Sequence, residues 1–196
     1  QGASAAPQWA DAAGGAWEVV STHVLAGSTD TLNFTGWSNA YAQYKVVFQS
    51  VYHASGTRMR IRFYMDATSG NTGTLATAQS YRYSTEEYTI GSAPPGVNRS
   101  NGEWNYYVGE NTNNTFWEGE SIIPMKTDAV PLEPLMYGWF HNPNHMFREP
   151  DVGSFDLNSS QYLTGIQIRW AAAGAYNASL RAPTSGRVTL LRMKYS

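Results

Sequence analysis

The sequence predicts an all-β chain: an antiparallel β-sandwich, jelly-roll-like, with an extended N-terminal arm. It contains about nine or ten short runs of alternating or β-branched residues, separated by Gly, Pro, Asn and Ser. A helix is not predicted anywhere, because the only Ala-rich run, at 171–175, is short and contains Gly174. Strands joined by polar turns, with a few long connections, favour two packed sheets over a simple meander.

Composition excludes several classes of protein. A chain of 196 residues can bury a real core, and with 14% aromatic and 14% charged residues it is not disordered. The absence of cysteine excludes a disulfide scaffold and a thiolate metal site. Lys and Arg number 13 against 15 Asp and Glu, so we expect no polyanion partner such as nucleic acid. No apolar run is long enough to span a membrane, and no cofactor is expected.

Residues 1–15 predict an arm or linker from a stalk. The segment is rich in Gly and Ala, is broken by Pro7 and has no periodicity. Trp9 is unusual in a free linker, so we expect it to dock on this chain or on a neighbour. The remaining 16–196 predict one β-sandwich domain. A first residue Gln1 in place of Met suits a fragment or a processed product.

The first strands are predicted at 17–24, 31–35, 44–51 and 58–66. The strand at 31–35 directs Leu32 and Phe34 to one face. A turn at 53–57 separates the last two runs, which predicts that they form a hairpin.

The strand at 58–66 alternates almost perfectly. One face carries Met59, Ile61, Phe63 and Met65, and the other carries Arg58, Arg60, Arg62 and Tyr64. Three like charges on one strand face need compensation. A salt-bridged solvent face is the ordinary interpretation of such a row. The alternative is a contact with another subunit or with a particle, because Arg is enriched at interfaces.

The second half of the chain alternates between predicted strands and polar connections. Loops are expected at 67–77, at 91–103, which contains Pro94 and Pro95, and over the Pro- and Asn-rich 142–158. Strands are expected at 79–90, 104–108, 115–125, 134–141, 162–172 and 186–195.

An aromatic set near the expected loops is the candidate glycan site. Aromatic rings stack on sugar rings, and polar side chains bind sugar hydroxyl groups. Aromatic residues that alternate along strands are, however, more often part of a core. The candidate residues are Trp104, Tyr106, Tyr107, Trp117 and Trp139, with Phe116 beside them.

Candidate catalytic and metal-binding residues carry weaker signals. His141 and His145 are four residues apart, but Pro143 between them excludes a helix, so we expect two loop histidines and no metal. Glu118 and Glu120 share one strand face, and paired carboxylates with nearby aromatics are what glycoside hydrolysis needs. Such pairs are also common on surfaces. No nucleophile motif or phosphate loop is present.

Both ends of the chain resemble virion proteins of tailed bacteriophages. The opening 1–10 (QGASAAPQWA), with 14–17 (GGAW), resembles the junction where their repetitive stalk ends. Similar strand phrases follow at 32–36 (LNFTG), 44–48 (YKVVF), 163–168 (LTGIQI) and 186–190 (GRVTL). The usual ending "YGI" is replaced by 191–194 (LRMK), and the middle of the chain matches no family.

The resemblance implies a β-sandwich domain of a tail fibre, a head fibre or a capsid decoration, usually a trimer. We therefore expect a non-enzymatic structural and adhesive protein on the virion surface, a homotrimer that contacts other virion proteins and in some cases host surface polysaccharide. Trp9, Trp17, Arg58, Arg60 and Arg62 are the expected subunit or particle contacts. The alternatives are a polysaccharide-degrading enzyme and a lectin-like glycan-binding module.

Overall fold

The computed structural model of the chain contains thirteen strands and no helix within the part that it describes. Its backbone covers residues 17–53, 57–76, 81–86, 96–101, 104–108, 115–125, 135–142, 145–155, 161–172 and 179–194. The predicted arm and Trp9 lie outside the described residues. The strands are β1 (Glu18–Leu25), β2 (Thr31–Thr35), β3 (Tyr41–His53), β4 (Thr57–Asp66), β5 (Thr74–Leu75), β6 (Tyr81–Glu86), β7 (Gly96–Asn101), β8 (Trp104–Val108), β9 (Thr115–Pro124), β10 (Leu135–Asn142), β11 (His145–Phe155), β12 (Tyr162–Ala172) and β13 (Ser185–Lys194).

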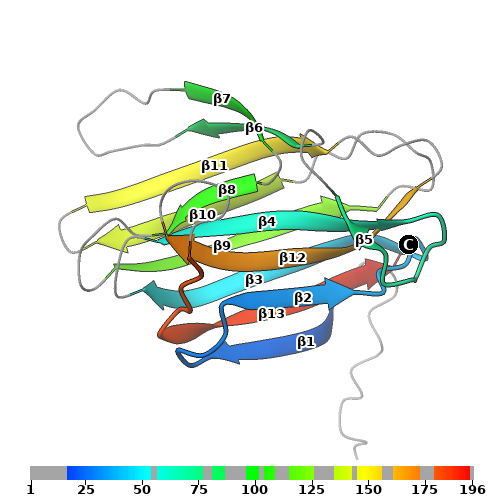
Figure 1. Cartoon of the computed structure of the whole chain (residues 1–196), viewed down its shortest axis with the longest axis horizontal. Coiled ribbons are helices and arrows are strands. Elements are labelled where there is room, and N and C mark those ends of the chain that lie inside the picture. Colours follow the sequence, from blue (N-terminus) through cyan, green and yellow to red (C-terminus); the bar gives the residue numbers. More distant parts are fainter. Residues whose placement is uncertain are drawn as a thin grey trace, which may run out of the picture.

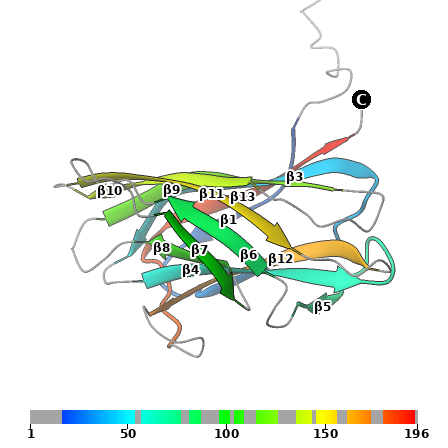
Figure 2. The same cartoon turned by 90° about the horizontal axis from the view of Figure 1, so that it is seen from above.

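The strands form two antiparallel sheets, which we call the large and the small sheet. The large sheet has eight strands in the order β1-β13-β3-β9-β10-β11-β6-β7, and the small sheet has the order β2-β12-β4-β5, with β8 also paired to β4 (Figure 1). Seen from above, the two sheets lie in two layers, with β3, β9 and β10 over β4 and β12 (Figure 2). This confirms the predicted antiparallel β-sandwich, whereas its jelly-roll connectivity stays a prediction.

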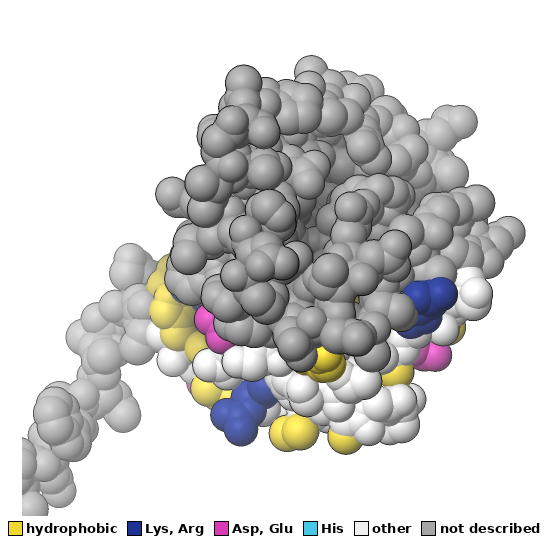
Figure 3. All heavy atoms as spheres, turned by 90° about the vertical axis from the view of Figure 1, so that its left-hand side faces the viewer, with side chains coloured by type: hydrophobic (Ala, Val, Ile, Leu, Met, Phe, Trp, Pro, Cys, Tyr) yellow, Lys and Arg dark blue, Asp and Glu magenta, His cyan; other side chains and the backbone are white. Residues whose placement is uncertain are grey.

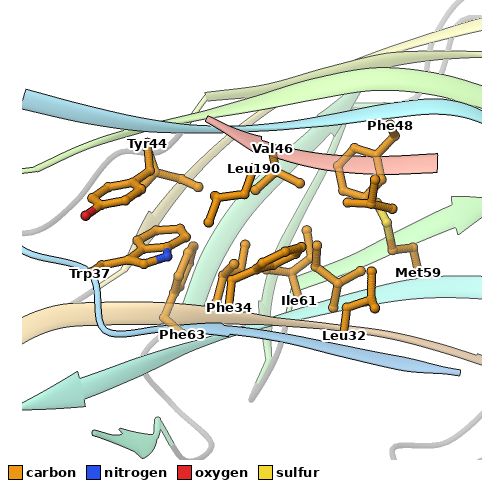
Figure 4. Close-up of a cluster of buried hydrophobic side chains, with 14 of the residues drawn as sticks. Leu32, Phe34, Trp37, Tyr44, Val46, Phe48, Met59, Ile61, Phe63 and Leu190 are labelled. Carbon is orange, nitrogen blue, oxygen red and sulfur yellow. The ribbon is translucent and has the colours of Figure 1, made fainter. Parts of the chain in front are cut away.

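The core lies between the sheets and is built by alternation. From the large sheet come Tyr44, Val46, Phe48 and Leu190, and they meet residues of the small sheet and of the turn after β2 (Figure 4). Those partners are Leu32, Phe34, Trp37, Met59, Ile61 and Phe63. All ten are at most 5% exposed. The alternation predicted for β2 and β4 is therefore confirmed on its apolar side.

The predicted hairpin between β3 and β4 is wrong. β3 pairs with β13 and β9 in the large sheet, and β4 pairs with β12, β8 and β5 in the small sheet. The two strands therefore belong to different layers of the sandwich. Both strands direct apolar residues into the same core. Two strands that are neighbours in one sheet and two strands that face each other in different sheets have the same sequence pattern.

Three segments predicted as loops contain strands. The short β5 lies within the predicted loop 67–77, β7 lies within the predicted loop 91–103, and β11 lies within the Pro- and Asn-rich 142–158. Pro150 in β11 is opposite Tyr137 of β10, and the pairing of β11 with β6 begins only at Asp151. Pro150 therefore has a partner strand on one side only among the described pairings, and proline is tolerated at such edge-like positions. Tertiary pairing overrides the weak local signal of these segments.

Candidate functional site

The outer face of the small sheet carries part of the predicted arginine row. Met59 and Ile61 of β4 face the core, so Arg60 and Arg62 between and after them face outward. Arg60 is nevertheless only 1% exposed, which corrects the expectation that all three arginines lie at solvent. Alternation shows which face a residue is on, not what covers that face. Arg60 is therefore not exposed for contact with another subunit or with a particle. Contacts of that kind stay a prediction for Arg58 and Arg62.

The neighbouring strand β12 adds polar residues to the same face. Arg169 is directly opposite Arg60, and Gln167 is directly opposite Arg62. Because Ile166, Ile168 and Trp170 of β12 are fully buried in the core, the alternate residues Gln167 and Arg169 lie on the outer face. Directly opposed residues of an antiparallel pair have their Cβ atoms about 5 Å apart. The outer face of the small sheet thus brings together Arg60 and Arg62 of β4 and Arg169 of β12.

Hydrogen bonds order the accessible part of this face. The hydroxyl of Tyr64 donates to Asn33 Oδ1 at 2.8 Å, and Gln167 Nε2 donates to the same oxygen at 3.0 Å. Asn33 lies on β2, opposite Gln167, and is exposed. With its carbonyl oxygen engaged twice, the amide group of Asn33 presents its N–H₂ as a donor. We call Asn33, Arg62, Tyr64, Gln167 and Arg169 the polar cluster.

Sequence reasoning missed most of this cluster. Arg62 and Tyr64 were in the predicted row, but Asn33, Gln167 and Arg169 lie far away in the chain. The alternation of β12 contained a signal, since Gln167 and Arg169 interrupt its apolar residues. The three strands become neighbours only through the order β2-β12-β4, which local patterns do not determine.

The predicted aromatic set is divided between the two sheets by strand register. Trp104, Tyr106 and Tyr107 lie on β8 in the small sheet, where they are opposite Ile61, Met59 and Arg58. Trp117 and Trp139 lie on β9 and β10 in the large sheet, opposite Val51 and Glu118. The five residues therefore do not belong to one sheet.

Trp17 and the predicted carboxylates lie on the large sheet. Lys45 Nζ sits 4.6 Å from the centroid of the Trp17 ring and forms an ion pair with Glu120 at 3.3 Å. Glu118 accepts a hydrogen bond from Ser50 Oγ at 3.0 Å. Glu120 is thus neutralised by a neighbouring strand, and Trp17 is held by a residue of its own chain. With Glu118 bound to Ser50 and Glu120 bound to Lys45, the two carboxylates do not resemble a pair that flanks a substrate.

The histidines lie at a hairpin. His145 is opposite Asn142, and His141 is opposite Met146, so the two histidines are not register partners. Among the described residues, no group of three or more His, Asp and Glu side chains could hold a metal ion. Likewise, no helix in the described part is long and apolar enough to cross a membrane.

The edge strand β1 differs from the rest of the sandwich. It pairs with β13, and Val19, Val20 and Val24 are 60%, 43% and 68% exposed. Val24 is opposite Arg187, on the outer face. One end of β1 is held by Glu18, which accepts two hydrogen bonds from Arg192 at 2.9 and 3.0 Å. The Arg192 guanidinium lowers the pKa of Glu18 and its own pKa is raised in return.

Few charged side chains are visible among the described atoms at one end of the molecule (Figure 3). At the end of the molecule shown in Figure 3, the basic and acidic side chains form only small separate patches among white and yellow atoms. This agrees with the low share of charged residues in the sequence.

Comparison with known proteins yields only distant similarities. No family model and no curated protein matches the chain. Among solved structures, a PL-14 alginate lyase from Aplysia kurodai is similar with a TM-score of 0.30 and 10% identity, over 85% of this chain and 82% of that one. A structure of infectious bursal disease virus, Gx strain, has a TM-score of 0.15 and 10% identity, over 91% of this chain and 42% of that one. Neither likeness carries an argument about function.

Proposed function

We propose that the chain is a structural and adhesive protein of a bacteriophage particle surface, a fibre or decoration protein that assembles with copies of itself, as a homotrimer, and with other virion proteins. The observation that carries the proposal is β1. This strand follows directly after the segment that resembles a phage stalk junction, and it exposes two valines by 60% or more.

The physical argument concerns the edge of a sheet. An edge strand presents unpaired backbone N–H and C=O groups, and soluble monomers usually protect such edges with Lys, Pro or a covering segment. β1 contains neither Lys nor Pro. Its aliphatic side chains gain about 0.8 kcal/mol per CH₂ group that a neighbour removes from water. Within the described part of the chain, β1 is therefore an uncovered edge that supports an interface with another chain.

Two measurements test the proposal. Mass spectrometry and antibody-labelled electron microscopy of purified particles should find the chain at a symmetric surface position. Sedimentation of the isolated chain should show a trimer that Val24→Lys weakens, because a charge on this surface resists burial. Thr74→Lys, at an exposed position of β5 in the small sheet, is the matched control. A chain absent from particles, or a monomer at all concentrations, contradicts the proposal.

A further inference from the structure

The large sheet carries aliphatic side chains on both of its faces. Its inward residues on β3, β13 and β9 belong to the core, so the residues that alternate with them face away from the small sheet, which forms the other layer (Figure 2). Three of these outward residues are aliphatic, namely Val47, Leu191 and Ile122. An antiparallel sheet with one solvated face normally alternates apolar residues inside with polar residues outside. The departure from that pattern indicates that a partner covers the outer face.

The strand register places these residues in two adjacent rows that cross the sheet. In one row Val19 of β1 is opposite Leu191, and Lys45 and Ile122 continue the row on β3 and β9. The other row begins with Thr22 of β1 and continues through β13 into β3. The uncharged residues of the two rows form what we call the outer strip: Val19, Thr22, Val47, Ile122, Thr189 and Leu191.

The outer strip is open to solvent where it reaches the edge of the sheet. Val19 is 60% exposed, and Thr22 is exposed as well. Among the described pairings β1 has a neighbour on one side only, so another chain has free access to the strip from this edge. The edge strand and the face behind it therefore form one continuous surface.

The charges beside the outer strip favour a second copy of the chain as its partner. Lys45 and Glu120, which lie in the same two rows, form an ion pair at 3.3 Å and are only 17% and 21% exposed. Because these charges are paired within the chain and the strip itself is uncharged, an identical strip opposite it meets no excess of like charge. A strongly acidic or basic partner, in contrast, finds no complementary charge there.

We propose that neighbouring copies of this chain cover the outer strip in the trimer, with β1 nearest the three-fold axis. The inference rests on the trimer proposed above and names the surface that its copies share, which extends from β1 across β13 and β3 to β9. A free edge can approach the axis, where each residue meets its own equivalents in the other copies. Residues farther from the axis meet a different part of the next copy, as in any cyclic assembly.

The first experiment asks whether the contact includes the face or only the edge strand. Ile122 lies on β9, the third strand from β1 in the sheet order, and is opposite Lys45. The single chain therefore tolerates Ile122→Glu beside this lysine, whereas burial against another copy disfavours the added charge. We expect Ile122→Glu to raise the concentration at which the trimer dissociates at least about tenfold, measured by sedimentation. Thr74→Glu, at an exposed position of β5, is the matched control, and urea unfolding shows whether both variants stay folded.

The second experiment locates the three-fold axis. The natural chain contains no cysteine, so a single introduced cysteine reports on one position. We expect Val19→Cys and Thr22→Cys to form covalent dimers with a short bismaleimide, because each meets its equivalent near the axis. One cysteine per chain joins two chains at most, so a denaturing gel separates the product from the monomer. Thr74→Cys should remain monomeric on the same gel.

The outcomes separate this inference from the trimer itself. A trimer that Val24→Lys weakens and Ile122→Glu does not would confine the contact to the edge strand and overturn the inference. A trimer that crosslinks through Thr74→Cys but not through Val19→Cys or Thr22→Cys would place the axis elsewhere. If Val19→Cys reacts with maleimide in the isolated trimer and is protected only in purified particles, another virion protein covers the strip. A chain that is monomeric at all concentrations refutes the trimer and this inference with it.

Discussion

Among the glycines that the structure describes, Gly165 of β12 is the one where an added methyl group meets the least space. It lies between Thr35 of β2 and Tyr64 of β4. An added Cβ would overlap the carbonyl oxygen of Phe34 and come within 2.9 Å of Thr35 Cα. Backbone atoms held in a ladder cannot move aside without disturbing the ladder. The absence of a side chain at Gly165 therefore lets β2 and β12 pair closely.

We expect Gly165→Ala to lower the free energy of unfolding by about 1–3 kcal/mol through overpacking. The midpoint of urea unfolding measures the effect. Gly27→Asn is the control, because no atom lies within 4 Å of its added Cβ and Asn tolerates its φ of 81°. Equal stability of Gly165→Ala and the natural chain would show that β2 shifts freely.

Trp37 joins the two layers through a stacked pair. Its ring lies 4.3 Å from that of Tyr44, centroid to centroid, with an angle of 4° between the planes. Tyr44 Oη in turn accepts a hydrogen bond from the backbone N–H of Ser38 at 2.9 Å. Burial raises the pKa of Tyr44, in keeping with its place in the core.

Trp37→Ala should cost about 3–5 kcal/mol of unfolding free energy, because it opens a cavity beneath β3. Trp37→Phe should cost clearly less, since it keeps an aromatic ring against Tyr44. Thermal unfolding of the two variants, followed by near-ultraviolet circular dichroism, separates them. If both variants lose the same amount, the stack with Tyr44 contributes nothing beyond buried area.

At the scale of an element, β1 depends on one ion pair at its N-terminal end. Glu18 has its pKa lowered from 4.5 by the hydrogen bond from Arg192. At a pH between the folded and the unfolded pKa of Glu18, the folded state therefore binds fewer protons than the unfolded state. The contribution of the pair is complete above the unfolded pKa and is lost as the pH falls through the folded pKa.

We expect the stability difference between the natural chain and Glu18→Gln to be present at pH 7 and to disappear as the pH falls through the lowered pKa of Glu18 in the folded state. Because the pair is exposed, the difference should be small and should shrink in high salt. Chemical unfolding at a series of pH values measures it. A difference that does not change with pH would assign the effect to packing instead of charge.

Three strand boundaries could be predicted. The bounds predicted for β2, β8 and β12 are those of the structure. In β2 the buried Leu32 and Phe34 alternate with less buried residues, which is the local signal of a strand. β7 and β11 could not be predicted, since their Gly, Pro and Asn residues give no local β signal and their pairing partners supply the order. The assignment of β3 and β4 to one hairpin failed because a sequence pattern does not say which sheet a strand joins.

At the scale of the whole molecule, the β-sandwich could be predicted from composition and strand spacing, whereas the polar cluster could not. The arginine row was visible in the sequence because its residues are adjacent in one strand. Asn33 and Gln167 were not, because 134 positions separate two side chains that share a hydrogen bond. The burial of Arg60 was equally hidden, since it depends on what lies above the sheet.

The pairing of the first strand with the last has a mechanical consequence. Glu18 at the start of β1 is opposite Arg192 near the end of β13, so the two ends of the sandwich leave from the same place. A force applied through both ends would peel β1 from β13 one hydrogen bond at a time, because the bonds are loaded in sequence. A force applied between the N-terminal segment and a partner bound to the large sheet would load the hydrogen bonds between β1 and β13 in a different way. Single-molecule pulling with handles at both ends should therefore show a low first unfolding force that Glu18→Gln lowers further.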